Sequence, residues 1–374
     1  MPKNLTVLQI LPALVAGGVE RGTVEIAAAI VAAGGRALVA SAGGPLVAEV
    51  IAAGGEHTTL PMGAKAPWAI ASNAAALARI IREKGVGIVH ARSRAPAWAG
   101  FFAARRTGAH FVTTYHGAYN EGFLGKRLYN SVMARGERVI AISGFIRDLI
   151  IARHDIDPQR ICLIPRGVDT IAFDPAAVTP ARAAAFRAKV GLDAATPMIL
   201  LPARLTRWKG QVVAVRALAA LPGPAVLVLA GGDAAGTFAN ELRALAGSFG
   251  IADRLRFAGH VTDLPAALST ADLVLHTSTD PEAFGRTVIE AQAMARVIIA
   301  SDLGAPRETV AEGITGFRSP PGDPAALSAA MARVLAMTPE IRAEIGARAR
   351  AAVLRDYTRE AMQAATLAVY RDLS

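Results

Sequence analysis

The 374-residue sequence contains a single cysteine, Cys162, which lies in the apolar segment 161–164. One cysteine cannot form a disulfide within the chain, which is typical of a protein from a reducing compartment. A lone cysteine in an apolar segment is most often a core residue. We therefore expect a cytoplasmic protein in which Cys162 belongs to a buried strand.

Long apolar runs are also absent, since no stretch approaches the roughly 18 residues that a membrane-spanning helix needs. Residues 5–16 faintly resemble a signal peptide, but Gln9 and Pro12 interrupt them. The segment then leads directly into Gly17-Gly18 and a helical pattern, as a first buried strand does. We expect a protein that is soluble or peripheral to a membrane.

Aromatic residues make up only 5% of the chain, whereas its formal net charge is +10. Residues 1–170 hold 19 Lys/Arg against 11 Asp/Glu, and residues 171–374 hold 21 against 19. A basic first half favours a phosphorylated substrate or an anionic membrane as partner. Nucleic acid is not an expected partner, because the few aromatic residues do not alternate with the basic ones as stacking platforms would.

Residues 120–138 have the pattern of an amphipathic, basic helix. Its apolar residues are Phe123, Leu124, Leu128, Tyr129 and Met133, and its basic residues are Lys126, Arg127, Arg135 and Arg138. Such a helix is typical of a membrane surface, but an ordinary domain helix with a solvated face has the same composition.

Short apolar strands alternate with helical segments through the whole chain. Strands are predicted at 5–11, 36–41, 87–90, 110–114, 138–142 and 160–164, and again at 198–202, 225–230, 254–257, 273–276, 297–300 and 315–317. This alternation predicts an α/β fold with two doubly wound parallel sheets. Pro175, Pro180 and a polar helix place the boundary near 174–193, which gives domains 1–175 and 190–356 and a final segment 357–374.

The loop 280–290 carries two carboxylates eight positions apart, Glu282 and Glu290. It follows the buried strand 271–276, and a helical pattern begins at Thr287, so Glu282 lies in the loop and Glu290 in the second turn of the helix. The first N–H groups of that helix and the bare backbone of Gly285 suit an anion. The loop therefore predicts a place that holds a phosphate with a sugar beside it.

A second polar segment follows the strand 198–202. Arg204 and Lys209 lie between a strand's end and a helix's start, where they can converge on a diphosphate. The alternative is a solvated loop in which Trp208 covers the edge of the core. The Glu282 loop favours the first interpretation, because both loops belong to the same edge of one sheet.

Three further features follow predicted strands. Gly17-Gly18 opens a helix after the first strand, His116 precedes Gly117, and His260 with Val261 follows the strand 254–257. The glycines allow a phosphate or sugar to approach, His116 is a candidate polar contact, and the backbone at His260 can bind a nucleobase. A plain tight turn, a structural histidine and a surface histidine are the respective alternatives.

Together these features resemble the retaining glycosyltransferases of family four, which have the GT-B architecture. The resemblance covers nearly the whole chain and rests on the order and spacing of its motifs. They are 17–21, 139–143, 164–169, Arg204 with 209–210, 257–259, and the pair Glu282 and Glu290.

The resemblance implies two Rossmann-like domains that face a central cleft, with a last helix that crosses back onto the first domain. It also implies a metal-independent, retaining hexosyltransferase without a cofactor, whose second domain binds a nucleotide-diphosphate sugar and whose first binds the acceptor. The implied catalytic residues are Glu282, His116, Arg204 and Lys209. The implied donor-binding residues are Gly17, Gly18, Arg204, Lys209, His260, Val261, Glu282, Ala283, Phe284, Gly285, Arg286 and Glu290.

Individual roles follow from the same resemblance. Arg204 and Lys209 hold the diphosphate, Glu290 holds the ribose hydroxyls, and Glu282 with the backbone of 283–285 holds the transferred sugar. Gly17-Gly18 and His116 close on that sugar.

The sequence departs from the family pattern at three positions. Ala283 stands where glycine is common, and Ala295 and Val297 stand where the turn after Glu290 often has glycine and proline. The segments 281–286 and 301–306 are most similar to enzymes that build bacterial lipopolysaccharide cores. This predicts a lipopolysaccharide-core or other cell-envelope glycolipid as acceptor, and a peripheral location on the cytoplasmic face of the inner membrane.

Two other functions fit the same architecture. A sugar-nucleotide epimerase needs an acid and a base in its site, and only His116 is available to pair with Glu282. A non-catalytic nucleotide-sugar-binding partner would not need all four of Arg204, Lys209, Glu282 and Glu290. A nicotinamide dehydrogenase is disfavoured, because neither half has the glycine fingerprint with its downstream acid.

Overall fold

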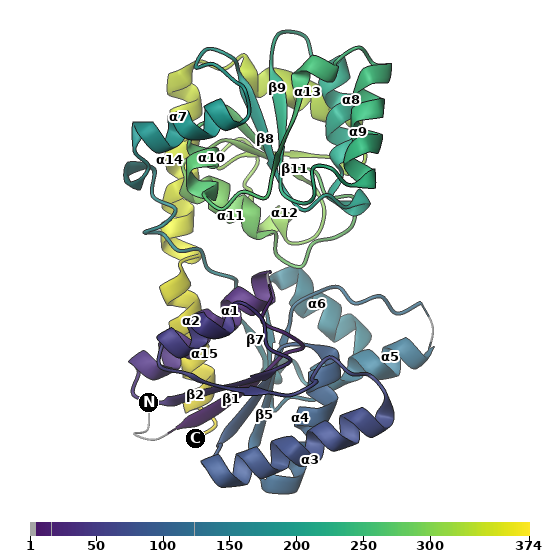
Figure 1. Cartoon of the computed structure of the whole chain (residues 1–374), viewed down its shortest axis with the longest axis vertical. Helices are drawn as coiled ribbons and strands as arrows, with labels where there is room; N and C mark the ends of the chain where they lie inside the picture. Colours follow the sequence, from purple (N-terminus) through teal and green to yellow (C-terminus); the bar gives the residue numbers. More distant parts are fainter. Residues whose placement is uncertain (1–4, 16, 123) are drawn as a thin grey trace. The chain divides into compact units, whose positions relative to one another are not determined.

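The computed structural model describes residues 5–15, 17–122 and 124–374, and it divides into two compact units (Figure 1). Unit 1 comprises Met1–Arg166 and Arg359–Ser374, and unit 2 comprises Gly167–Thr358. The boundary expected near 174–193 lies inside unit 2. The reason is helix α7 (Pro180–Lys189), whose Phe186 is buried in the core of unit 2.

Unit 1 is built on a parallel sheet with the strand order β3-β2-β1-β4-β5-β6-β7. The strands are β1 (Thr6–Ile10), β2 (Arg36–Ser41), β3 (Glu56–Thr59), β4 (Ile88–Ala91), β5 (His110–Tyr115), β6 (Arg138–Ala141) and β7 (Ile161–Leu163). The helices are α1 (Gly18–Ala32), α2 (Val47–Ala52), α3 (Pro67–Lys84), α4 (Arg94–Thr107), α5 (Leu124–Asn130), α6 (Gly144–Arg153) and α15 (Arg359–Arg371), with 3-10 turns at Ser131–Ala134 and Pro158–Arg160. The order of the strands reverses direction between β1 and β4.

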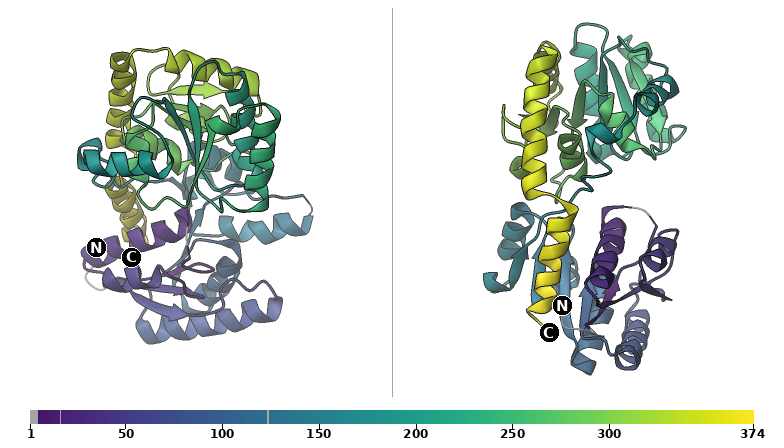
Figure 2. Two further views of the ribbon diagram at one scale, coloured as in Figure 1. Left: turned by 45° about the horizontal axis from the view of Figure 1, so that its top comes forward. Right: turned by 90° about the vertical axis from the view of Figure 1, so that its left-hand side faces the viewer.

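The last helix, α15, belongs to the core of unit 1 (Figure 2). Its Tyr370 is fully buried, and the hydroxyl of Tyr370 lies 2.6 Å from Nδ1 of His90 on β4. Its Gln363 donates to the carbonyl oxygen of Glu25 on α1 at 2.8 Å. The C-terminal helix is therefore fixed both to the sheet and to α1.

Unit 2 has a second parallel sheet, with the order β10-β9-β8-β11-β12-β13. The strands are β8 (Met198–Pro202), β9 (Val226–Ala230), β10 (Leu255–Gly259), β11 (Leu273–His276), β12 (Ile298–Ser301) and β13 (Phe317–Ser319). Besides α7 the helices are α8 (Gln211–Ala220), α9 (Thr237–Ser248), α10 (Leu264–Ser269), α11 (Arg286–Ala293), α12 (Pro306–Thr309), α13 (Pro324–Leu335) and α14 (Pro339–Asp356), with 3-10 turns at Pro175–Ala177, Arg207–Lys209 and Ala252–Arg254. Here the order reverses direction between β8 and β11.

Helices cover both faces of the unit 2 sheet (Figure 1). Side chains of a strand alternate between the two faces, so an apolar strand makes both faces apolar, and helices bury them. Ile199 and Leu201 of β8 are buried in a core cluster with α8, α9 and α13. Met198 and Leu200 point to the other face, where their cluster includes α7, α10 and α11. The prediction of two doubly wound parallel sheets is confirmed.

Strand β3 was not predicted from the sequence. Its residues Glu56-His57-Thr58-Thr59 are only partly buried or exposed, and they lie at the edge of the sheet. An edge strand exposes much of its surface to water, so it lacks the apolar run by which buried strands are recognised.

The prediction of one amphipathic helix over 120–138 is wrong in its extent. The structure has the short helix α5 followed by the 3-10 turn Ser131–Ala134, and Phe123 lies outside the described residues. Met133 is fully buried and its carbonyl accepts from Thr113 Oγ1 at 2.6 Å, whereas Leu128 is 63% exposed. The turn therefore packs into the unit while α5 stays on its surface. Among the described residues, no helix is both long and apolar enough to span a bilayer.

The turn after α11 accounts for one departure from the family pattern. Ala295 has φ 53°, and among the residues with described structure no other non-glycine residue has a positive φ. The carbonyl oxygen of Ala295 also lies against α14, where a Cβ on Gly346 would approach it to 2.1 Å. The position where the family often has glycine therefore requires the left-handed conformation here too.

We expect the substitution Ala295→Gly to stabilise unit 2. The left-handed conformation costs an alanine roughly 1–2 kcal/mol through steric strain. Glycine avoids that strain, but it loses more conformational entropy on folding, which costs about 0.5–1 kcal/mol. The free energy of unfolding should rise by about 0.5–1 kcal/mol in a denaturant titration. The control Ala291→Gly, inside α11, should lower it by about 1 kcal/mol or more. A decrease in both variants would contradict the assignment of strain to Ala295.

Candidate active site

The candidate site of unit 2 lies where β8 and β11 are neighbours and the strand order reverses. Ligands of doubly wound sheets bind beyond the carboxyl ends of strands at such a point. The loops that leave the two strands are hydrogen-bonded to each other, because Thr279 N donates to Trp208 O at 2.8 Å and Thr277 Oγ1 donates to Lys209 O at 2.9 Å. The loops after β8 and β11, which the sequence placed at the same edge of one sheet, are therefore joined by hydrogen bonds.

Gly210 makes this close contact possible. It has φ 73°, and a Cβ at this position would lie 1.8 Å from the carbonyl oxygen of Thr277. No other residue fits between the two loops without moving one of them. Gly210 also precedes α8, so Lys209 lies next to the N-terminus of that helix.

The side chain of Glu282 is the centre of the site. Its Oε1 accepts hydrogen bonds from Lys209 Nζ at 2.5 Å, from His276 Nε2 at 2.7 Å and from Ser278 Oγ at 2.5 Å. The exposed fraction is 11% for the Glu282 side chain and 14% for that of Lys209. An ion pair this buried is screened little by water.

The surroundings of Glu282 favour its ionised form. Burial alone raises the pKa of a carboxyl, but the charges and hydrogen bonds of His276 and Lys209 outweigh it and lower the pKa of Glu282 well below its ordinary range. Glu282 is therefore a carboxylate at neutral pH. It can accept hydrogen bonds from sugar hydroxyls and stabilise positive charge, but it is a poor proton donor.

The backbone of the Glu282 loop is fixed as well. The carbonyl oxygen of Glu282 accepts from Ala305 N at 3.0 Å, and a Cβ on Gly304 would lie 2.6 Å from the same oxygen. Phe284 is buried, and its ring makes an edge contact with Tyr357 at 5.9 Å between centroids. The segment that was expected to hold a sugar is thus fixed by a backbone hydrogen bond and by the packing of Phe284.

Glu290 forms a second, separate ion pair. Its Oε1 lies 3.4 Å from Nη2 of Arg286, one turn earlier on α11, and Glu290 is 7% exposed. Gly285 caps the helix with φ 80°, and no side chain among the described residues caps it. The N-terminal amides of α11 therefore lie between the Glu282 loop and the Arg286–Glu290 pair, where they favour an anion.

The structure brings some predicted donor residues together and leaves others apart. Lys209 and Glu282 are in direct contact, and Ala283, Phe284 and Gly285 lead from them to α11. Arg204 is exposed, and its side chain forms no hydrogen bond within the part of the chain that is described; its carbonyl accepts from Gln211 Nε2 at 2.8 Å.

His260 and Val261 follow the edge strand β10, which β9 separates from β8. The His260 side chain is exposed, and the His260 carbonyl accepts from Lys189 Nζ at 3.5 Å. No contact joins them to Glu282 among the described residues.

In unit 1, Gly17 and Gly18 begin α1 after β1, and Gly17 has φ 137°. The carbonyl oxygen of Gly18 accepts a hydrogen bond from Arg166, whose guanidinium lies so close to α1 that a Cβ on Gly22 would approach it to 2.4 Å. Gly22 of this helix thus makes room for the buried Arg166, which lies in the segment after β7.

His116 follows β5, and its Nε2 is buried without a hydrogen-bond partner among the described residues. Burial lowers the pKa of His116 well below its ordinary value, and the positive charges of Arg92 and Arg166 lower it further. His116 is therefore a neutral imidazole at pH 7.

The sequence analysis missed His276 and Ser278 in unit 2, and Arg92 and Arg166 in unit 1. His276 ends β11, Arg92 follows β4 and Arg166 follows β7. A polar residue at or directly after the end of a buried parallel strand is the signal that could have identified His276 and Arg92, since such residues lie at the ligand-binding edge. Arg166 lies three residues beyond the edge strand β7, so that signal does not reach it. Ser278 carries no comparable signal.

The described residues contain no group of three or more His, Cys, Asp or Glu side chains placed to hold a metal ion. Lys209, His276 and Ser278 are instead hydrogen-bonded to Glu282, and Arg286 is ion-paired with Glu290.

Two family models match the chain. Residues 16–171 match the model described as Glycosyltransferase Family 4, and residues 183–352 match that of Glycosyl transferases group 1. Among curated proteins, the D-inositol 3-phosphate glycosyltransferase of Acidothermus cellulolyticus is 30% identical over 318 residues, which are 79% of this chain and 69% of that protein.

The protein of the same name from Mycobacterium sp. strain KMS is 33% identical over 188 residues, half of this chain. That match spans 42% of the relative, so the chain covers less than half of its length.

Solved structures match over nearly the whole chain. A glycosyltransferase from Rickettsia africae has a TM-score of 0.92 and 35% identity, and the match covers 99% of this chain and 98% of that one. HepE from Anabaena in complex with UDP and glucose has a TM-score of 0.85 and 21% identity, over 98% and 100%. WaaG, a glycosyltransferase involved in lipopolysaccharide biosynthesis, has a TM-score of 0.76 and 18% identity, over 96% and 99%.

We expect Glu282→Gln to lower the free energy of unfolding by about 3 kcal/mol at pH 7, because Lys209 loses its buried counter-charge. The lowered pKa of Glu282 adds a pH dependence. The unfolded chain binds a proton at this residue below about pH 4.5, while the folded protein does not, so wild-type stability falls as the pH drops through that range.

The glutamine variant lacks this dependence. Denaturant titrations at pH 7 and pH 4 should therefore show a smaller difference between wild type and variant at the lower pH. A difference that stays constant or grows would contradict an ionised Glu282.

Proposed function

The chain belongs to glycosyltransferase family 4, and from this premise we propose that it transfers a hexose from a nucleotide-diphosphate sugar to an acceptor, with retention and without a metal ion. The observation that carries the proposal is the convergence of Lys209, His276 and Ser278 on one oxygen of Glu282 at the switch point of unit 2. A cation, a carboxylate and a helix N-terminus meet there, which suits a sugar joined to a diphosphate.

The donor diphosphate lies, in this proposal, against Lys209 and the N-terminal amides of α11. Breaking the bond between sugar and phosphate places negative charge on the departing diphosphate, and Lys209 stabilises that charge. Arg204, whose exposed side chain has no other partner among the described residues, can bind the same phosphates bidentately. Cations and backbone amides thereby supply what a metal ion supplies in other transferases.

The sugar lies beside Glu282, whose carboxylate accepts hydrogen bonds from hydroxyls and opposes the positive charge that develops at the anomeric carbon. Because the pKa of Glu282 is lowered, this residue does not take the acceptor's proton in our proposal. A phosphate oxygen of the leaving group takes it, so that the acceptor attacks from the face on which the diphosphate departs. Glu290 binds the ribose hydroxyls.

An epimerase is less well supported. Such an enzyme exchanges protons with its substrate and needs an acid and a base with pKa values near the working pH. The pKa values of Glu282 and His116 are both lowered by their surroundings. A non-catalytic nucleotide-sugar-binding partner remains the other alternative, and it would bind the donor without transferring or hydrolysing the sugar.

The acceptor we propose is a phosphorylated or acidic cell-envelope glycolipid, such as a lipopolysaccharide core, at the cytoplasmic face of the inner membrane. The excess of basic residues in residues 1–170 supports an anionic acceptor. The curated relatives are named for D-inositol 3-phosphate, which makes a soluble cyclitol phosphate the second candidate. Incubation with labelled donor and each acceptor class in turn decides between them, because only the true acceptor becomes labelled.

We expect Lys209→Ala to lower kcat/KM by about 10²–10³-fold, the loss typical for one group that stabilises a transition-state charge. Glu290→Ala should weaken nucleotide binding. The matched control is Arg207→Ala, because Arg207 lies on the same loop but is exposed and pairs with Glu241 at 2.8 Å. Steady-state transfer assays and a thermal-shift screen of UDP, GDP and ADP give both quantities. Wild-type turnover and nucleotide binding in both variants would overturn the proposed donor site.

A further inference from the structure

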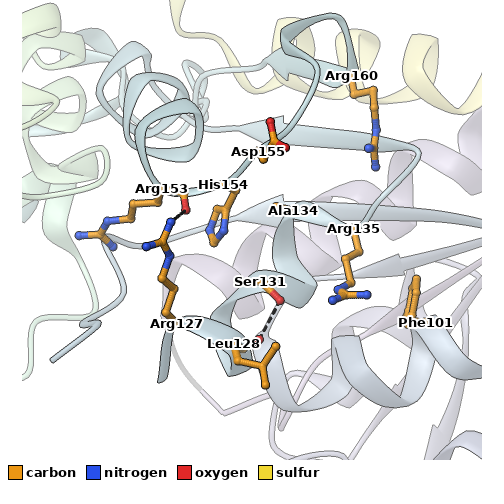
Figure 3. Close-up of a pocket in the computed structure, with 10 residues that line it drawn as sticks. All are labelled: Phe101, Arg127, Leu128, Ser131, Ala134, Arg135, Arg153, His154, Asp155 and Arg160. Carbon is orange, nitrogen blue, oxygen red and sulfur yellow. Dashed lines mark hydrogen bonds between the residues drawn. The ribbon is translucent and has the colours of Figure 1, made fainter. Parts of the chain in front are cut away.

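A cavity of about 630 Å³ opens on unit 1, and none of the candidate catalytic or donor-binding residues lines it (Figure 3). It lies among α4, α5, the turn after α5 and the segment 153–160. Ligand pockets commonly have volumes of about 300–1,000 Å³, so it is large enough for a small molecule or a headgroup.

Four arginines line this cavity, Arg127, Arg135, Arg153 and Arg160, against one carboxylate, Asp155. In Figure 3 the guanidinium groups of Arg127 and Arg153 lie on one side of His154, and those of Arg135 and Arg160 lie on the other. An anion that enters the cavity therefore meets positive charge from both sides.

The arginines differ in how far their charge is already compensated. Arg153 donates to Tyr119 O at 2.5 Å and lies 3.8 Å from Glu121. Arg127 and Arg160 donate to backbone carbonyls, those of Arg153 and Gly136. Within the described part of the chain, no carboxylate forms an ion pair with Arg127, Arg135 or Arg160. Three uncompensated guanidinium groups thus share one cavity.

The cavity also has an apolar wall. Arg135 lies over the rings of Trp98 and Phe101, 5.4 Å and 5.5 Å from their centroids, and Phe101 lines the cavity. Leu128, another lining residue, is 63% exposed. Cations beside exposed apolar surface suit an amphiphile whose anionic group enters and whose apolar part stays at the rim.

The field inside the cavity also acts on His154. Burial lowers the pKa of His154, the carboxylate of Glu121 opposes that shift, and the charges of Arg127 and Arg153 lower the pKa further.

The topology separates this cavity from the ligand-binding edge of the same sheet. Arg135 precedes β6 and Arg160 precedes β7, so both lie at the amino ends of these strands. Gly17 and His116 follow β1 and β5 and lie at the carboxyl ends. Arg135 and Arg160 therefore lie at the opposite end of the sheet from its ligand-binding edge.

We propose that this cavity is a binding site for a phosphate group, either free or on a lipid headgroup, and that Arg127 and Arg135 are its principal ligands. The proposal does not depend on the transfer reaction. Its lining residues all belong to unit 1, whereas Lys209, Glu282 and Glu290 belong to unit 2. Loss of phosphate binding with intact nucleotide binding therefore separates a failure here from a failure of the proposed donor site.

The test compares the full-length protein with the double variant Arg127→Gln/Arg135→Gln. Two probes carry the same phosphate chemistry, glycerol 3-phosphate in solution and vesicles of phosphatidylcholine that contain phosphatidylglycerol. We expect wild type to bind at least one probe and the double variant to bind it about tenfold or more weakly, because charge-assisted hydrogen bonds are lost. Arg79→Gln, an exposed arginine on α3, removes one charge elsewhere and should leave the affinity unchanged.

Leu128→Glu provides a second variant, and it leaves all four arginines of the cavity in place. It places a carboxylate on the exposed rim and should weaken binding, whereas Leu128→Gln should not. Binding of both probes identifies a headgroup site that also accepts the free group, and binding of glycerol 3-phosphate alone identifies a soluble ligand. Equal affinity of wild type and double variant, or no binding of either probe at low salt, would overturn the proposal.

Discussion

The candidate site depends on one oxygen atom, Oε1 of Glu282, which accepts hydrogen bonds from Lys209, His276 and Ser278. Lys209 comes from the loop after β8, while His276 ends β11 and Ser278 lies in the loop after it. The two loops approach this closely only because Gly210 lacks a side chain. Burial makes an unpaired charge costly, so each member of the group fixes the others. The site is therefore organised before a ligand arrives, as electrostatic catalysis requires.

Unit 1 repeats this principle at its own switch point. Gln9 of β1 accepts from Arg92, which follows β4, at 2.7 Å, and both side chains are buried. His90 on β4 connects this pair to α15 through its contact with the hydroxyl of Tyr370. In each unit, polar side chains on or just after the two strands between which the strand order reverses are hydrogen-bonded to each other, Gln9 with Arg92 and Lys209 with Glu282. The doubly wound topology determines where each site lies, and the side chains of the loops determine which groups it can bind.

Much of the fold could be predicted because its central strands are buried on both faces and read as short apolar runs. Edge strand β3 has no such apolar run. The segment 120–138 has the apolar pattern of one amphipathic helix, but Met133 is apolar because it is buried in the core of unit 1. The spacing of Glu282 and Glu290 predicted a ligand-binding loop, and that loop follows β11 at the point where the strand order of unit 2 reverses. It could not predict that Lys209, 73 positions earlier, contacts Glu282, because that contact depends on the order of the strands.

The central claim is that the loops after β8 and β11 hold a nucleotide sugar by its diphosphate. A crystal structure of the full-length protein with a bound nucleoside diphosphate tests it most directly. The account predicts phosphate oxygens within hydrogen-bond distance of Lys209 Nζ and of the first amides of α11, with the ribose near Glu290. A nucleotide bound elsewhere, with the contact between Lys209 and Glu282 unchanged and its surroundings empty, would contradict it.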